Sequence, residues 1–389
     1  MTQTTLYQSF SNLSDPRINR RKLHNLLDII ILSILAVLCG AESYDSIALF
    51  GKENLAFLKQ FLGLKNGIPS HDTINRVFQA LNPYQFERCF ISWTQSIKNE
   101  GVLDRVIAID GKTCRGSKDS FRHKSALHSV HAWSVEHQLC LAQLECTEKT
   151  NEITVIPEIL DLLYIKGSII SIDAMGTQTA IAEKIVKNEG DYILAVKGNQ
   201  GKLEEDVQFV CKVNRSLSDT CEIDKGHGRI ETRRCQVFGT ELIDDDIAKR
   251  WKNLKTVVKI TSTREFSGKI ETQERLYISS LDAKNDFNKY IRSHWEVENK
   301  LHWVLDMVFR EDEQRKRAKH AAANFAIVRK IVFNLLKKDN GKESLRSKRL
   351  RATWNKDFLI QLLKILMRLP CNQIKDSEFL LIFFVSLQL

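Results

Sequence analysis

Two aspartates follow short apolar runs near the middle of the chain. Asp110 ends the run Val106–Ile109, and Asp173 ends the run Ser168–Ile172. A carboxylate at the end of a strand suits magnesium, which prefers oxygen ligands in octahedral geometry. Aspartates after strands also cap helices or form turns, so either residue alone leaves that interpretation open.

A third carboxylate has to come from another element, because two-metal phosphoryl-transfer sites gather acids from separate elements. The segment His294–Trp303 offers Glu296 and Glu298, whose side chains would point about 200° apart on a helix. Spacing of four residues would also place His294, Glu298 and His302 along one helical face. A zinc site is therefore an alternative, although the cysteine ligands typical of structural zinc are lacking.

The elements that would position these residues begin with helices. Apolar residues recur at threes and fours from about residue 25 to 98, which predicts an all-helical N-terminal domain over residues 1–98. Within it, Pro69–Thr73 precedes a short amphipathic helix that carries Asn75 and Arg76 on its polar side. This helix either enters a DNA groove in a helix-turn-helix manner or packs as a plain capped helix.

From residue 102 the pattern changes to short strands and helices. We predict strands at 106–111, 126–135, 139–145, 168–173 and 192–197, and helices at 154–163 and 179–188. This order is found in ribonuclease-H-like folds, where one acid lies on the first strand and another just after the fourth. Asp110 and Asp173 fall at those two places.

The remaining segments complete the predicted architecture. Strand patterns at 229–238 and 255–280 indicate a β-rich insertion, and helical periodicity returns over 287–336. We predict an α/β protein with a ribonuclease-H-like mixed-sheet catalytic core over 102–340, an insertion at about 201–282, and a basic, then apolar, helical segment over 341–389.

Six ordered motifs resemble the H-repeat-associated (Rhs-linked) group of bacterial insertion-sequence transposases, which carry an Asp-Asp-Glu triad. These motifs are Ile109–Ser117, Lys149–Ile153, Asp173–Gln178, Lys197–Gln200, Gly226–Arg233 and His294–Asp306, and Gly67–Thr73 resembles the associated N-terminal domain. The resemblance implies that Asp110, Asp173 and Glu298 are the catalytic and metal-binding carboxylates. It also implies two Mg²⁺ ions, for which Mn²⁺ substitutes.

Several residues are candidates for DNA contact. Lys112, Lys197, His227 and Arg229 either hold phosphates or terminal bases or have solvated or structural roles. Related groups place a Tyr, an Arg and a Lys around the glutamate, but those offsets hold Ile291, His294 and Leu305 here. We expect His294 to replace the arginine in part, and Arg292 to contact a phosphate.

Composition is consistent with a nucleic-acid partner without proving one. The net charge of +10 is spread along the chain, and the densest basic runs are Arg315–Lys319 and Lys342–Arg351. These runs form either DNA-binding faces or solvated helix faces. The apolar runs at 29–39 and 379–389 are shorter than the roughly 20 residues of a membrane span. Nine cysteines without a Cys-x-x-Cys pair indicate reduced thiols in a cytoplasmic protein. For a bacterial transposase we also expect association with the nucleoid.

The expected activity is cleavage at the ends of an insertion sequence followed by joining of the 3′ end to target DNA. The expected partners are double-stranded DNA at terminal inverted repeats and at the target, and a second copy of the chain, because two ends must be brought together. Two alternatives remain open. One is a catalytically inactive DNA-binding descendant of a transposase, and the other is a structure-specific nuclease that never joins DNA.

Overall fold

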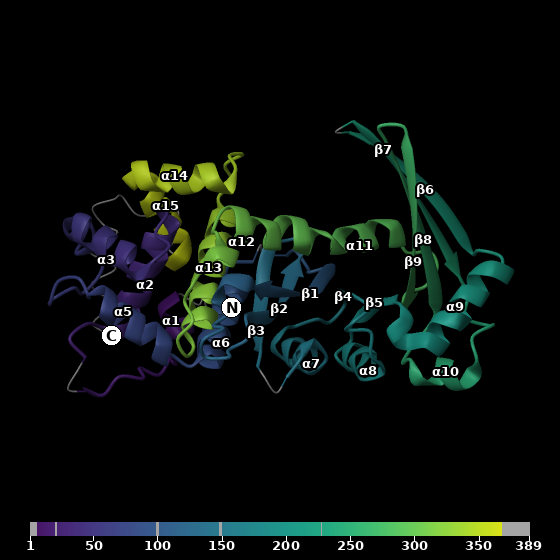
Figure 1. Cartoon of the computed structure of the whole chain (residues 1–389), viewed down its shortest axis with the longest axis horizontal. Helices are drawn as coiled ribbons and strands as arrows, with labels where there is room; N and C mark the ends of the chain where they lie inside the picture. The colour runs from purple at the N-terminus through teal and green to yellow at the C-terminus, as the bar shows by residue number, and fades with distance from the viewer. Residues whose placement is uncertain (1–5, 20–21, 99–100, 148–149, 227, 368–389) are drawn as a thin grey trace.

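A mixed β-sheet runs along the length of the molecule, with most helices gathered at one end of it (Figure 1). The computed structural model describes residues 6–19, 22–98, 101–147, 150–226 and 228–367. Within these residues the sheet has nine strands in the order β3-β2-β1-β4-β5-β9-β8-β7-β6. The strands are β1 (Val106–Cys114), β2 (Leu127–Ser134), β3 (Leu139–Cys146), β4 (Ile169–Ile172), β5 (Asp191–Val196), β6 (Ser218–Gly226), β7 (Arg229–Phe238), β8 (Thr256–Phe266) and β9 (Lys269–Ser279).

The first five strands form the predicted ribonuclease-H-like core. β1 pairs antiparallel with β2 and parallel with β4, and β4 pairs parallel with β5. The helices α7 (Glu152–Leu162) and α8 (Thr179–Lys187) connect strands on one face, as parallel pairing requires. Every residue of β4 is buried, as expected for a strand covered on both faces. The predicted order of elements and the fold class are confirmed.

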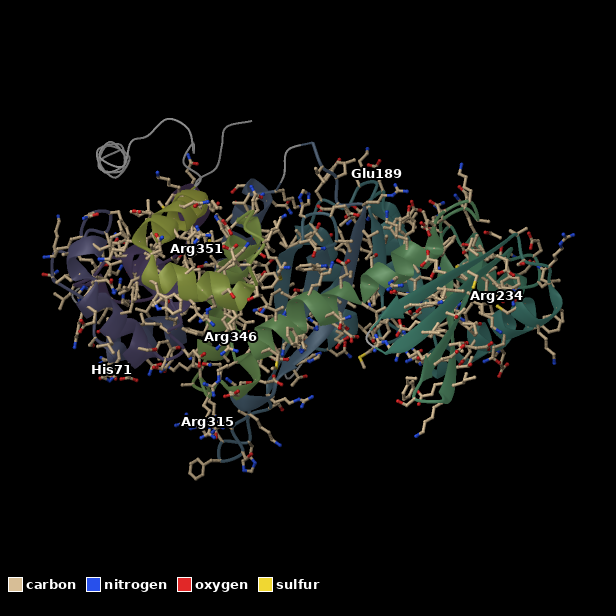
Figure 2. The ribbon with its side chains drawn as sticks, turned by 90° about the horizontal axis from the view of Figure 1, so that it is seen from above. His71, Glu189, Arg234, Arg315, Arg346 and Arg351 are labelled. Carbon is tan, nitrogen blue, oxygen red and sulfur yellow. The ribbon has the colours of Figure 1, made fainter. Side chains whose placement is uncertain are left out.

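The insertion continues the same sheet. β9 pairs antiparallel with β5, and β8, β7 and β6 follow as a long meander. Figure 2 shows Arg234 of β7 at the end of the molecule away from His71. The insertion also contains α9 (Gly201–Val213) and α10 (Asp245–Arg250). We did not predict β6, whose residues are almost all exposed and lack an apolar alternation.

Helices from both ends of the chain form one helical unit beside β3. Its members are α1 (Leu6–Phe10), α2 (Leu26–Leu38), α3 (Tyr44–Glu53), α4 (Leu55–Leu58), α5 (His71–Ala80), α6 (Pro83–Ser96), α13 (Ala321–Lys338), α14 (Leu345–Trp354) and α15 (Lys356–Met367). α2 is buried almost throughout, which confirms that its apolar run is a core helix. Asn324 of α13 donates to the carbonyls of Phe78 (2.8 Å) and Leu81 (2.9 Å). The domain boundary at residue 98 stays a prediction.

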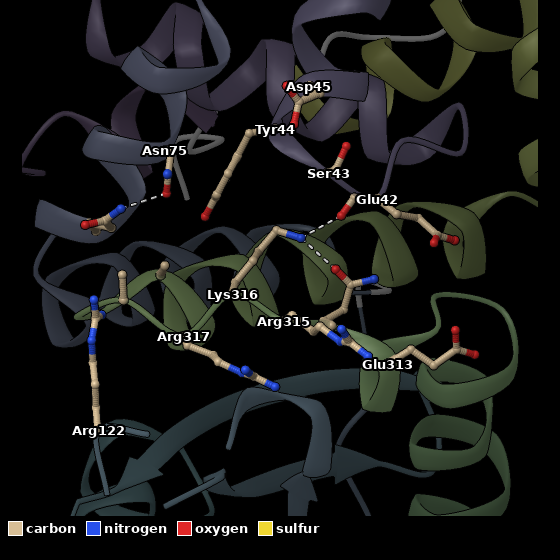
Figure 3. Close-up of a pocket in the computed structure, with 14 residues that line it drawn as sticks. Glu42, Ser43, Tyr44, Asp45, Asn75, Arg122, Glu313, Arg315, Lys316 and Arg317 are labelled. Carbon is tan, nitrogen blue, oxygen red and sulfur yellow. Dashed lines mark hydrogen bonds between the residues drawn. The ribbon is translucent and has the colours of Figure 1, made fainter. Parts of the chain in front are cut away.

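The segment after the sheet is less regular than the periodicity indicated. It comprises α11 (Phe287–His294), a π-helix η4 (Val297–His302), α12 (Trp303–Met307) and a 3-10 turn η5 (Glu311–Glu313), and a loop precedes α13. The basic run at 315–319 lies in this loop, so the expectation of a helix face was wrong there. Lys316 of the loop donates to the carbonyl oxygen of Glu42 and to Gln314, both at 2.6 Å (Figure 3).

The second basic run also differs from expectation, because part of it is buried. Lys348 of α14 contacts Asp339 at 2.9 Å, and Arg349 donates to the carbonyl of Val37 at 2.8 Å. These two side chains hold the helical unit together instead of facing DNA. The apolar run at 379–389 lies outside the described residues. No helix in the described part of the chain is both long and apolar enough to cross a membrane.

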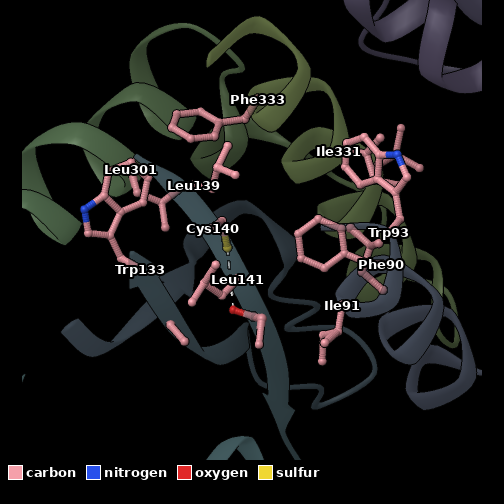
Figure 4. Close-up of a cluster of buried hydrophobic side chains, with 14 of the residues drawn as sticks. Phe90, Ile91, Trp93, Trp133, Leu139, Cys140, Leu141, Leu301, Ile331 and Phe333 are labelled. Carbon is pink, nitrogen blue, oxygen red and sulfur yellow. Dashed lines mark hydrogen bonds between the residues drawn. The ribbon is translucent and has the colours of Figure 1, made fainter. Parts of the chain in front are cut away.

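One core joins the helical unit to the first strands of the sheet (Figure 4). It contains Trp93 of α6, Trp133 of β2, Leu141 of β3, Leu301 of η4 and Phe333 of α13, all of them buried. Trp133 and Phe333 meet edge to face, with ring centroids 5.9 Å apart. The π-helix is therefore anchored in the same packed interior as the strands, which fixes the side chains that it presents to the sheet.

Candidate active site

The three predicted carboxylates line one cavity. Asp110 lies on β1 and Asp173 directly follows β4, and the parallel pairing of Ile109 with Ile172 brings the two aspartates to the same edge. Helix α11 lies over β1 and β4, and η4 follows it in the chain. Glu298 of η4 reaches the same edge of the sheet. The cavity that these carboxylates line has a volume of ≈ 680 Å³. Three separate elements thus converge on one space.

The three acids crowd each other electrostatically. Burial raises the pKa of Asp110 to about 7, with further contributions from the charges of Glu298 and Asp173. Burial also raises the pKa of Asp173, although the backbone N–H groups of Gly176 and Met175 donate to it and act in the opposite direction. The pKa of Glu298 is raised by burial and by Asp173. A bound cation would relieve this repulsion.

The cavity fits a hard divalent cation in its donor chemistry. Carboxylate oxygens are the ligands that magnesium prefers, and these three share a space large enough for water. Among the described residues, no three His, Cys, Asp or Glu side chains already stand at the spacing that holds an ion. The fit therefore rests on donor type, the shared cavity and unrelieved negative charge.

The π-helix separates the two neighbouring glutamates. Glu296 accepts a hydrogen bond from Gln138 at 2.7 Å and pairs with Lys300 at 2.8 Å, whereas Glu298 faces the cavity. His294 instead approaches the Ser171 hydroxyl at 2.9 Å, and His302 turns to other partners. Both histidines thus have protein partners, and no cluster of three possible metal ligands is found among the described residues, so the structure adds nothing in favour of the zinc alternative.

A buried chain of side chains leads to Asp110. Nε2 of His131 lies 3.1 Å from the Ser129 hydroxyl, its Nδ1 lies 2.8 Å from Nε2 of His302, and Nδ1 of His302 faces Asp110 at 3.5 Å. Burial lowers the pKa of His302 to about 3 and also lowers the pKa of His131, so both rings are neutral. Because an ionised Asp110 only accepts, His302 presents Nδ1–H to it, His131 donates to His302, and Ser129 donates to His131. This chain orients the carboxylate.

Lys112 does not line the cavity, which favours a structural role over a phosphate contact. Its ammonium is buried and lies 2.7 Å from Asp306, 3.4 Å from Asp312 and 3.9 Å from Glu311. Glu311 is itself fully buried and also faces Arg329 and Lys330 of α13, at 3.2 Å and 3.7 Å. This network ties β1 to the segment that follows η4, so Lys112 supports the site structurally.

The other predicted DNA-contact residues are spread over several places. Lys197 is exposed on the cavity wall, and His294 lines the same cavity with a pKa that burial lowers to about 4, so it is neutral. Arg292 pairs with Asp224 at 2.7 Å. Arg229 lies at the β6–β7 turn and pairs with Glu231 at 3.2 Å. His227 lies outside the described residues.

Two residues near the cavity were missed from the sequence. Arg275 of β9 lines the cavity and stacks on Trp295 at 4.2 Å. Its positive charge partly opposes the rise that burial causes in the pKa of Glu298. Glu152 lies 2.6 Å from Nε2 of His128, and its charge acts on both aspartates. A Cβ at Gly111 would overlap the carboxylate of Glu152, so that carboxylate lies directly against the backbone of β1. Glu152 belongs to a quoted motif, whereas Arg275 carried no local signal.

Comparison with known families agrees with this site. A family model described as "Transposase DDE domain" matches residues 102–335, which include all three carboxylates and more than half of the chain. The chain belongs to the DDE transposase family. A second model, for the domain associated with the DDE domain, matches residues 7–94.

Relatives of this DDE transposase match nearly the whole chain. "H repeat-associated putative transposase YhhI" of Escherichia coli K12 is 43% identical over 371 residues, covering 92% of this chain and 97% of that protein. "Putative transposase YncI" of Escherichia coli O157:H7 is 39% identical over 376 residues, covering 93% and 95%. The resemblance to the H-repeat-associated group is confirmed. The piggyBac transposase synaptic complex with hairpin DNA, solved by cryo-EM, aligns at a TM-score of 0.43 with 11% identity, covering 98% of this chain and 81% of that one.

Proposed function

We propose that this transposase cleaves DNA at the ends of an insertion sequence and joins the freed 3′ end to target DNA. The observation that carries the proposal is the convergence of Asp110, Asp173 and Glu298 from three elements on one cavity. Their crowding is the condition that divalent ions resolve in two-metal phosphoryl-transfer sites. Membership of the DDE family supports the same chemistry.

The three carboxylates are the residues that would hold two Mg²⁺ ions, or Mn²⁺ in their place. Such ions, when bound, lower the pKa of an attacking water or 3′-hydroxyl and stabilise the leaving oxygen. The chain itself orients Asp110 through His302 and places the positive charges of Arg275 and Lys197 on the cavity wall. These cations are suited to holding the phosphates that flank the reacting one.

The proposed partners are terminal inverted repeats and target DNA, with two copies of the chain in a synaptic complex. Joining one element to a target requires both ends to be held together, and a pair of identical subunits supplies two sites. The reaction would take place on the nucleoid of a bacterial cytoplasm, where the DNA is.

The deciding experiment is a cleavage and joining assay on an oligonucleotide duplex that carries the DNA flanking the coding sequence. The wild-type protein is compared with Asp173→Asn, which keeps the size of the side chain, and with Glu296→Gln, which lies outside the cavity. Magnesium, manganese and chelator are tested in parallel. We expect metal-dependent joined product from the wild type and from Glu296→Gln, and none from Asp173→Asn.

The other outcomes separate the alternatives. Metal-dependent hydrolysis without any joined product would identify a nuclease. Salt-sensitive binding without any strand cleavage would identify a catalytically inactive DNA-binding protein. Equal joining by the Asp173→Asn variant would show that the reaction occurs elsewhere.

A further inference from the structure

Two loops next to the active site are locked together. Nζ of Lys124 donates to the carbonyl oxygens of Arg317 (3.0 Å) and Lys319 (2.8 Å). The backbone N–H of Arg115 donates to Asp312 at 3.2 Å. A Cβ at Gly116 would lie 2.5 Å from the carbonyl oxygen of Asp312, so the two backbones touch. We call the paired segments 115–124 and 312–320 the two-loop surface.

The first loop presents an aromatic ring to solvent. Asp119 and Lys124 pair as an antiparallel bridge, with backbone hydrogen bonds of 3.0 Å and 2.9 Å. The turn between them carries Phe121, which is 92% exposed. Because the bridge closes the loop, the phenyl ring is held away from the core at a defined position. Such a ring offers an apolar face with nothing from the described chain against it.

The same surface carries positive charge that the chain does not neutralise. Lys118, Arg122, Arg315 and Lys319 are exposed and form no ion pair with any described residue. The acids beside them have other partners, since Asp312 contacts Lys112 and Glu313 contacts Arg310. Asp119 accepts a hydrogen bond from the backbone N–H of Arg122 at 3.3 Å. Unpaired cations around an exposed aromatic ring are the combination that binds a phosphate backbone and stacks on a base.

A cavity of ≈ 490 Å³ connects this surface to the helical unit (Figure 3). Arg122, Arg315 and Arg317 line it from the loops, and Asn75 and Gln79 line it from α5. α5 is the helix for which the sequence left groove binding and a plain capped helix as alternatives.

Lys316 in the same cavity has a different role. It is tied to a backbone carbonyl and lies 4.0 Å above the Phe325 ring, and burial lowers its pKa to about 7. It anchors the loop and leaves the arginines to face the cavity.

The two-loop surface lies within reach of the carboxylates. Arg115 directly follows β1, five residues beyond Asp110. Because a strand rises about 3.3 Å per residue, Asp110 and Arg115 are about 17 Å apart along β1. Since DNA rises about 3.4 Å per base pair, this distance corresponds to about five base pairs.

We propose that the two-loop surface holds the DNA end that is being processed, with phosphates against its cations and one unpaired base stacked on Phe121. The inference deepens the function proposed above and rests on it for the identity of the DNA. In this proposal the two-loop surface and α5 of the helical unit together form one continuous DNA-binding surface.

The stacking contact is tested with Phe121→Ala, Phe121→Trp and the control Tyr164→Ala, which removes another exposed ring. The probes are two synthetic duplexes of one sequence, one blunt and one with unpaired terminal bases that include a fluorescent adenine analogue. Stacking on an aromatic ring contributes about 1–3 kcal/mol per base, so Phe121→Ala should bind the unpaired end at least about 5-fold more weakly. Phe121→Trp and Tyr164→Ala should bind as the wild type does. Equal affinity and equal fluorescence of the Phe121→Ala complex would overturn the stacking assignment.

The charge contact is tested with the triple variant Arg122→Ala, Arg315→Ala, Lys319→Ala. Its control is Lys249→Ala, Arg250→Ala, Lys252→Ala, three exposed cations in and beside α10 at the far end of the sheet. The slope of log affinity against log salt should fall by about 0.9 for each phosphate that the variant no longer neutralises, roughly 2 to 3 in total. An equal decrease of slope in the control, or none in the loop variant, would refute the surface.

Binding is measured in the Asp173→Asn background, where the DNA is not cleaved. The binding proposal and the proposed reaction can therefore be refuted independently. If binding maps to the two-loop surface while the otherwise wild-type protein cleaves nothing, the surface stands and the proposed reaction falls. If cleavage and joining proceed but the loop variants bind unchanged, the reaction stands and the surface falls.

Discussion

Replacing Asp110 with Asn should stabilise the metal-free protein at alkaline pH. The pKa of Asp110 is raised from 3.8 to about 7 in the folded state, mainly by burial and then by Glu298 and Asp173. A carboxyl whose folded-state pKa is raised contributes stability that is fully present below pH 3.8 and is lost as pH rises through about 7. The amide of Asn cannot ionise, so the variant does not undergo this loss.

The structure sets the size of the effect. A pKa moved from 3.8 to about 7 corresponds to about 4 kcal/mol at a pH above both values. The side chain of Asp110 is only 17% exposed, so solvent screening removes little of this energy. For 389 residues the entropy of unfolding is about 0.8 kcal/mol/K, which converts the energy into about 5 °C in Tm.

The assay is thermal unfolding of wild type and Asp110→Asn in chelator between pH 4 and pH 8. The variant should melt above the wild type at pH 8, and the difference should shrink toward pH 4. Adding Mg²⁺ should raise the Tm of the wild type at pH 8 and leave that of the variant nearly unchanged. Glu205→Gln, which neutralises an exposed acid on α9, is the control and should show neither effect. If Asp110→Asn melts below the wild type at pH 8, burial and like charge do not destabilise the ionised Asp110 as argued.

Three further perturbations test the surroundings of the site and the helical unit. Glu311→Gln leaves Lys112, Arg329 and Lys330 without their shared carboxylate and should lower the free energy of unfolding in urea by about 3–5 kcal/mol. The pKa of Glu311 is lowered to about 2, so its contribution to stability should be intact at neutral pH and should be lost between pH 4.5 and 2. The measurement is the difference in free energy of unfolding between wild type and variant, which should shrink over this pH range. His302→Phe removes the donor that faces Asp110 and should weaken Mg²⁺ binding about 10-fold or more by calorimetry, while unchanged affinity would contradict the orienting role. Asn324→Ala leaves the carbonyls of Phe78 and Leu81 without their donor and should cost about 2 kcal/mol in urea unfolding.

The core strands were predictable because their apolar runs are short and clearly bounded. β4 is buried along its whole length, and the residue that follows it, Asp173, marks the end of the run. Parallel pairing of neighbouring strands then dictates that Asp110 and Asp173 meet at one edge. The positions of these two carboxylates therefore followed from local pattern and from general sheet geometry.

The surroundings of the site could not be predicted in this way. Lys112 follows the strand aspartate as an ordinary polar residue, and only the fold brings to it the carboxylate of Asp306, 194 residues away. Arg275 enters the cavity because β9 pairs with β5, a partner that no local pattern specifies. The π-helix breaks the spacing of four that suggested a shared face for His294 and His302. Each of these features depends on contacts between distant segments.

The packing of α13, α14 and α15 against α2 and α6 has a consequence for how the chain folds during synthesis. Trp93 donates to the carbonyl of Leu366, and Arg349 donates to that of Val37, across 273 and 312 residues. α2 therefore leaves the ribosome roughly 280 residues before α13, a delay of roughly 15 to 60 s at usual elongation rates. During this interval α3 can cover part of α2, but the surface that packs against α13 and α14 stays exposed, so nascent chains should depend on chaperones. A product that ends before residue 321 would contain Asp110, Asp173 and Glu298 but lack Arg329 and Lys330 of α13, which contact Glu311, and it should therefore be aggregation-prone.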